Sequence, residues 1–169
     1  MRDNVITPPS DEPVSLPLVK SHIRLLHSDL DTVVSTYMQI AVELVESKTG
    51  MQLMEATREV ITDKTTDEIF LFREPFIEVV SVKKDNEDIE YDLYDNEKPV
   101  RIEIATTKAP VHVRYKAGYT SAANIPTDLK GAILLLVGRL YENPQDPVDR
   151  HLSLAEKIIK KYRVRSWQG

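Results

Sequence analysis

The chain has 169 residues, of which 41% are hydrophobic and 29% are charged, a composition typical of one globular domain. No apolar run approaches the ~20 residues that a membrane helix needs, and the absence of cysteine excludes disulfides, thiolate nucleophiles and cysteine-bound metals. The formal net charge of -5 argues against nucleic acid as the main partner, because nonspecific nucleic-acid binders are usually basic.

The N-terminal part of the chain predicts an arm followed by two helices. Residues 1–14 are rich in proline and polar side chains, so we expect a flexible arm. A short helix is predicted from Leu16 to about Leu26, with Ser15 as its cap. A second helix is predicted from Asp29 or Asp31 to Thr49, and Gly50 ends it. Its apolar residues recur at helical spacing: Val34, Tyr37, Met38, Ala41, Leu44 and Val45.

The middle of the chain changes to the two-residue alternation of β-strands. Five or six short strands are predicted, at 58–62, 69–72, 77–82, 89–94, 100–104 and 111–115. The acidic stretch 85–88 lacks the glycine that an EF-hand calcium loop requires, so we interpret it as a hairpin turn. Short strands joined by tight turns indicate an antiparallel sheet or a small barrel.

The C-terminal part returns to helical periodicity. Thr127 or Asp128 is expected to cap a helix that ends at Asn143-Pro144, in which Gly131 and Gly138 permit close packing. Its expected buried stripe is Leu129, Ala132, Ile133, Leu136, Val137 and Leu140. A last helix is predicted over 153–162, with Leu154, Ile158, Ile159 and Tyr162 facing inward. The predicted fold class is α+β: a core of about four helices, two at each end of the chain, with an antiparallel β insert over about 57–116. One domain would then span 15–162, followed by a tail over 163–169.

Motifs of enzyme active sites are not found in the sequence. The four histidines, His22, His27, His112 and His151, are not paired at metal-binding spacing, and His112 is expected on the exposed face of a strand. Neither a glycine-rich phosphate loop nor a nucleophile elbow is present. We therefore expect no enzymatic activity, no metal and no cofactor.

Two segments carry charge of opposite sign. Residues 85–97 contain acidic residues and no basic ones: Asp85, Glu87, Asp88, Glu90, Asp92, Asp95 and Glu97. Residues 157–165 contain basic residues and no acidic ones: Lys157, Lys160, Lys161, Arg163 and Arg165. One interpretation is that both segments are solvated surface. The other is that they are two binding faces, which contact different partners or contact each other between copies of the chain. The basic segment also holds Tyr162 and Trp167. It is an exposed end, a protein-docking segment or a nucleic-acid contact, and the acidic net charge favours protein docking over nucleic acid.

Several motifs occur in the order found in one known family. They are SLPLVK at 15–20, VESKTG at 45–50, VRYKAGY at 113–119, IPTDLK at 125–130, LYEN at 140–143 and IIKKYR at 158–163. In these motifs the chain resembles the head–tail connector (adaptor) proteins of long-tailed bacteriophages and prophages, over roughly residues 15–165. It departs from the family at Asn143-Pro144, where the family often has arginine after Tyr-Glu.

The resemblance implies a structural protein of the virion neck that is present in the bacterial host cytoplasm during assembly. Such adaptors form a ring, commonly of twelve copies, beneath the portal protein. The ring extends the channel through which DNA passes without sequence-specific binding, meets the next neck, stopper or tail protein, and contacts no membrane. The alternative is a non-phage binding module whose β insert recognises a peptide or single-stranded nucleic acid.

The resemblance also implies which residues bind partners. The family's C-terminal segment reaches the portal, so the predicted portal-docking residues are Lys160, Lys161, Tyr162, Arg163, Val164, Arg165 and Trp167. The acidic residues predicted to contact a neighbouring copy or a neck protein are Asp85, Glu87, Asp88, Glu90 and Asp92.

Overall fold

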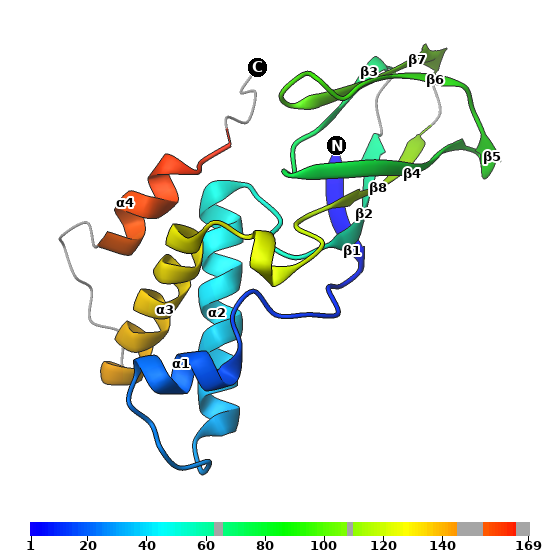
Figure 1. Cartoon of the computed structure of the whole chain (residues 1–169). Coiled ribbons are helices and arrows are strands. Elements are labelled where there is room, and N and C mark those ends of the chain that lie inside the picture. Colours follow the sequence, from blue (N-terminus) through cyan, green and yellow to red (C-terminus); the bar gives the residue numbers. More distant parts are fainter. Residues whose placement is uncertain (63–65, 108–109, 145–153, 165–169) are drawn as a thin grey trace. The chain divides into compact units, whose positions relative to one another are not determined.

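The computed structural model describes residues 1–62, 66–107, 110–144 and 154–164, which form two compact units (Figure 1). The helical unit contains the described residues of 11–49 and 121–163. The sheet unit contains those of 1–10 and 50–120, together with Val164. The chain therefore leaves the helical unit after its second helix and returns to it before the third. Within the described residues, none of the helices is long and apolar enough to span a membrane.

The helical unit contains α1 (Leu16–His22), α2 (Asp31–Thr49), α3 (Thr127–Glu142) and α4 (Leu154–Lys161). α2 packs on α3, and α3 packs on α4 (Figure 1). Most of the predicted apolar stripes is confirmed, because α2 buries Val34, Met38, Ala41 and Val45, and α3 buries Leu129, Ala132, Ile133, Leu136 and Val137. Tyr37 and Leu140 are only half-buried and Leu44 is exposed, so these three positions differ from the prediction. Each helix thus presents one apolar side to its neighbour.

Two helices differ from the sequence-based expectation. α1 ends at His22 rather than near Leu26, because the backbone turns into the left-handed region at Arg24, with a φ of 57°. α4 buries Ile159 as predicted, but it also buries Ala155 and leaves Leu154 exposed.

The two helical glycines also differ from each other. A Cβ on Gly138 would lie 3.5 Å from Nε2 of His22, which agrees with close packing of α1 on α3. A Cβ on Gly131 would meet no atom of the described residues within 4 Å, so the close packing expected there is not found in that part of the chain.

The sheet unit contains eight strands in two antiparallel sheets. They are β1 (Arg2–Thr7), β2 (Ala56–Thr62), β3 (Thr66–Leu71), β4 (Phe76–Lys84), β5 (Glu87–Asp88), β6 (Tyr91–Tyr94), β7 (Val100–Thr107) and β8 (Val111–Ala117). One sheet has the order β1-β2-β8-β4-β5, and the other has the order β3-β7-β6. Together with the helices, these sheets confirm the α+β fold class.

The inner faces of the two sheets share one apolar core. The five-stranded sheet contributes Val60, Val82, Val111, Val113, Tyr115 and Ala117, and the three-stranded sheet contributes Ile69, Leu71, Val100, Ile102 and Ile104. Since side chains alternate between the faces of a strand, every second residue is buried from Val100 to Ile104 in β7 and from Val111 to Ala117 in β8. The alternation predicted at 100–104 and 111–115 is confirmed.

Residues 1–14 differ from the flexible arm expected for them. β1 pairs with β2 from Arg2, opposite Ile61, to Thr7, opposite Thr57. Pro8 and Pro9 follow at once, and proline cannot continue the ladder as a hydrogen-bond donor. The N-terminal segment is therefore an edge strand of the larger sheet over residues 2–7.

Two turns in the sheet unit have clear backbone causes. Asp85 and Asn86 both have positive φ values, 51° and 68°, as a two-residue hairpin turn requires, so the predicted turn at 85–88 is confirmed. Gly118 has a φ of 115°, and a Cβ there would collide with the backbone of Met54 and Glu55. The glycine of the VRYKAGY motif is therefore needed where β8 ends.

Candidate interaction surfaces

Asp128 fixes the end of α4 to the start of α3. Its carboxylate accepts hydrogen bonds from Nζ of Lys161 at 2.9 Å and from the hydroxyl of Tyr162 at 2.6 Å. The hydrogen bond from Tyr162, followed by that from Lys161, lowers the pKa of the Asp128 carboxyl group. The expected capping role is wrong, because Pro126 stands at the N-cap and no side chain caps the helix there.

The predicted portal-docking segment divides into three parts. Lys161 and Tyr162 are engaged by Asp128 inside the helical unit. Lys160 and Arg163 are exposed, and Val164 is half-buried. Arg165 and Trp167 lie outside the described residues. Among the described residues of this segment, the accessible positive charge is therefore carried by Lys160 and Arg163, together with the largely exposed ammonium group of Lys161.

The acidic segment lies on the β4–β5 hairpin and on β6. Asp85 is in the turn, and Glu87 and Asp88 form the short strand β5. Asp88 lies 3.6 Å from Nζ of Lys83 on the paired strand, an exposed ion pair that contributes little to stability. The carboxylates at 85, 87 and 88 are all exposed to solvent, as a contact surface requires.

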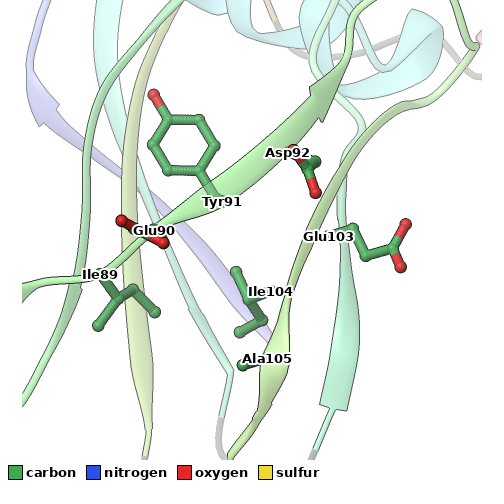
Figure 2. Close-up of a pocket in the computed structure, with 7 residues that line it drawn as sticks. All are labelled: Ile89, Glu90, Tyr91, Asp92, Glu103, Ile104 and Ala105. Atoms are coloured by element: carbon green, nitrogen blue, oxygen red, sulfur yellow. The ribbon is translucent and has the colours of Figure 1, made fainter.

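Glu90 and Asp92 line a pocket of about 670 Å³ on the sheet unit (Figure 2). The other lining residues are Ile89, Tyr91, Glu103, Ile104 and Ala105. Asp92 is directly opposite Glu103 across the β6–β7 pair, and Tyr91 is opposite Ile104. The pocket thus combines three carboxylates with apolar side chains and has no basic residue in its lining. This arrangement suits a cationic or aromatic side chain of another protein.

Arg101 organises the outer face of the three-stranded sheet beside this pocket. Its guanidinium group pairs with Glu97 at 2.9 Å, and with Glu68 and Glu103 at 3.1 Å each. It also lies 3.9 Å from the ring centroid of Tyr94. A hydrogen bond to Glu103 raises the pKa of Tyr94, because the phenol donates to a carboxylate.

The sequence analysis did not identify Arg101 as an organising residue. The alternation at 100–104 places Arg101 on the outer face, but its partners come from three segments of the chain. Only the pairing of β3, β7 and β6 brings them together. A single sequence carries no signal for that pairing.

The histidines give no sign of a metal or catalytic site in the described part of the chain. His112 is partly exposed on β8, 3.7 Å from Glu59, as expected for the outer face of a strand, while His22 packs beside Gly138. His151 lies outside the described residues. Among the described residues, no group of three or more metal-ligating side chains is placed to hold an ion.

A family model for head completion proteins matches residues 14–144, which include both sheets apart from β1, and helices α1 to α3. The chain belongs to this family. As a head completion protein, it is a structural connector at the head–tail junction of a phage-like particle, and the resemblance identified in the sequence is confirmed. β1 and α4 lie outside the matched residues.

Three solved structures share the fold of this head completion protein over 100% of its chain and 99% of theirs. They are the neck of an empty gene transfer agent (GTA) particle computed with C6 symmetry (TM-score 0.85, 20% identity), the virion of a native GTA particle (0.83, 20%) and the neck of a native GTA particle computed with C12 symmetry (0.76, 22%). No curated protein matches the sequence.

Proposed function

We propose that this head completion protein forms a ring in the particle neck, between the portal protein and the next neck or tail protein. One observation carries the proposal: a member of this family shares its fold, from end to end, with chains from particle necks of C6 and C12 symmetry. The ring surrounds the channel through which DNA leaves the head. Twelve copies are the proposed number, and the bacterial cytoplasm is the proposed place of assembly.

The distribution of charge supports a ring with two different subunit faces. A ring is built from head-to-tail contacts, so each copy needs two surfaces that complement each other. The β4–β5 hairpin and β6 present the acids Asp85, Glu87, Asp88, Glu90 and Asp92, and the end of α4 presents the bases Lys160 and Arg163. The acidic residues are therefore proposed contacts with a neighbouring copy or a neck protein.

The acidic balance of the chain also suits a DNA channel. Basic side chains that neutralise phosphates release counterions and hold the duplex, and this attraction is largely independent of sequence. A net charge of -5 provides little attraction of this kind. DNA then passes without being retained.

The C-terminal segment is the proposed portal-docking segment. Lys160 and Arg163 are exposed at the end of α4, and the chain continues with Arg165 and Trp167. Arginine and tryptophan are common anchors in protein interfaces, because they fill pockets and make strong polar or stacking contacts. Lys161 and Tyr162 hold α4 on α3 and thereby fix the point from which the segment leaves.

The experiment that tests this proposal measures binding to the portal protein encoded in the same gene cluster. The mass of the purified chain, of the portal and of their mixture is measured at micromolar concentration, with an unrelated portal as control. We expect a monomeric or weakly associated chain that adds to its own portal as a complete ring. A mixture in which the masses of both components stay unchanged would contradict the proposal.

A further inference from the structure

α2 carries a second row of apolar side chains, separate from its buried one. Val33, Tyr37, Ile40 and Leu44 follow the i, i+4, i+7, i+11 spacing and so lie on one face of the helix. Val33, Ile40 and Leu44 are 41%, 43% and 38% exposed, and Tyr37 is half-buried. The buried row of α2, from Val34 to Val45, lies about 100° further round the helix, at one residue's rotation.

The exposed row is continuous along one face of α2 rather than scattered. Single exposed apolar residues are common and need no explanation, whereas a contiguous apolar patch marks an interaction site. The helical unit fills its own core with the buried row of α2 and does not use the exposed one. We call the exposed row, Val33, Tyr37, Ile40 and Leu44, the α2 stripe.

α3 carries a second surface in the same unit. Gly131 lies inside the helix, where glycine is less favourable than alanine, yet among the described residues no atom lies within 4 Å of a Cβ built there. Leu135, one turn later on the same face, is exposed. We call this surface, Gly131 and Leu135, the α3 notch. A missing Cβ beside a protruding leucine allows a neighbouring helix to approach closely.

Charged residues also flank the two surfaces. Glu43 is exposed beside Ile40 and Leu44 on α2. Asp128 lies one turn before Gly131 on the same face of α3, and it holds the ammonium group of Lys161, whose side chain is 66% exposed. An exposed acid beside one apolar surface and an exposed ammonium group beside the other favour pairing between the two surfaces.

We infer that the α2 stripe of one copy packs against the α3 notch of the next copy and so joins neighbouring subunits of the ring. This inference rests on the proposed function, because it takes a second copy of the chain as the partner. The two surfaces differ from each other, so the contact is head-to-tail and repeats around a ring. The exposed parts of the α2 stripe are then removed from water on assembly.

Disulfide trapping tests the contact directly, because the natural chain contains no cysteine. The double variant Leu44→Cys/Leu135→Cys and each single variant are oxidised mildly, both alone at high concentration and bound to the portal. We expect the double variant to form a ladder of dimers, trimers and larger species. We expect each single variant to form almost none, and an equal mixture of the two to form dimers only. A control variant, Val5→Cys/Val80→Cys, places cysteines at exposed apolar positions of the sheet unit and should give no ladder.

Two outcomes would overturn the inference. One is the absence of a ladder from the double variant both alone and on the portal. The other is a Leu44→Cys single variant that cross-links to itself as efficiently as the double variant, since the α2 stripes would then face each other. If the double variant binds the portal but forms no ladder of cross-linked species, only this inference is contradicted. If the protein does not bind the portal, the proposed function is contradicted.

Gly131→Ala separates assembly from folding. Alanine adds helix propensity and meets open space, so the melting temperature of the isolated chain should rise by about 2–4 °C. The same substitution, made in the double-cysteine background, fills the notch and should reduce the yield of the ladder several-fold. A raised melting temperature with an unchanged ladder would show that α3 does not form the contact.

Discussion

Asp3 and Arg58 join the N-terminal strand to the centre of the larger sheet. Nε of Arg58 lies 2.8 Å from Oδ1 of Asp3, and the Arg58 side chain is only 7% exposed. The second oxygen of Asp3 accepts a hydrogen bond from the hydroxyl of Tyr115. Oε1 of Gln52 accepts a hydrogen bond from Nη1 of Arg58. Burial, followed by the nearby charge of Asp3, raises the pKa of Tyr115. β1 is therefore held by side chains as well as by its ladder.

Asp3→Ala should destabilise the sheet unit strongly. Removal of one partner from a buried ion pair leaves the other charge without compensation, which costs roughly 3 kcal/mol. Urea unfolding followed by circular dichroism measures this loss. Asn4→Ala changes the next, exposed residue of β1 and should alter stability by less than about 0.5 kcal/mol. Equal stabilities for the two variants would show that β1 does not depend on Arg58.

The attachment of α4 should weaken in acid. The pKa of Asp128 is lowered in the folded protein, so its contribution to stability is present above the ordinary value of 3.8 and is lost as pH falls through the folded value. At pH 6, Asp128→Asn should lower the free energy of unfolding by about 1 kcal/mol, because charged hydrogen bonds to Lys161 and Tyr162 are weakened. Urea unfolding at pH 6 and pH 3 measures the effect. A deficit that is as large at pH 3 as at pH 6 would contradict this role.

Periodicity in the sequence predicted α2, α3 and most strands correctly, because burial of one face leaves a repeat along the chain. It could not predict β1, whose neighbouring residues Val5 and Ile6 are both exposed and whose fixed position depends on Arg58, 55 residues away. Asp128 was interpreted as a cap for a similar reason, since its partner Tyr162 lies 34 residues later.

Less of the candidate interaction surfaces than of the helices and strands could be predicted from the sequence. The sequence placed the acids on a hairpin and the bases at the end of a helix, because turn residues and helical spacing are local signals. The pocket at Glu90 and Asp92 was not predictable, because it depends on the opposition of Asp92 to Glu103 across two strands. Pairing between strands is a property of the whole fold.

Removal of residues 163–169 should abolish portal binding and leave folding almost unchanged. The segment follows the last helix, and the helical core is complete at Tyr162. Within this segment, Trp167→Ala should weaken binding by about 2 kcal/mol, because we expect the indole side chain to fill a pocket on the portal. Higher salt should weaken binding further, because part of the attraction is ionic. Leu26→Ala, at an almost fully exposed leucine, is the matched control and should bind normally. Titration against portal, with a thermal melt of each variant, measures both properties. Unchanged affinity after truncation would move the docking site elsewhere, with the acidic segment as the next candidate.

The helical unit should fold without the sheet unit. The sheet core lies between the two sheets, and the helical core is formed by the stripes of α2, α3 and α4. A chain that lacks residues 1–10 and has a short linker in place of 51–119 should therefore keep a helical circular dichroism spectrum, with reduced stability. A spectrum typical of a fully unfolded chain would show that the two units fold as one.

The location of the chain in its own particle tests the account most directly. Cryo-electron microscopy of the particle neck, without imposed symmetry at first, would resolve which proteins lie between portal and tail. The account predicts a closed ring of this chain against the portal, with the C-terminal segment in contact with it and α2 of each copy beside α3 of the next. A neck that lacks this chain, or holds it in a position away from the portal, would contradict the account.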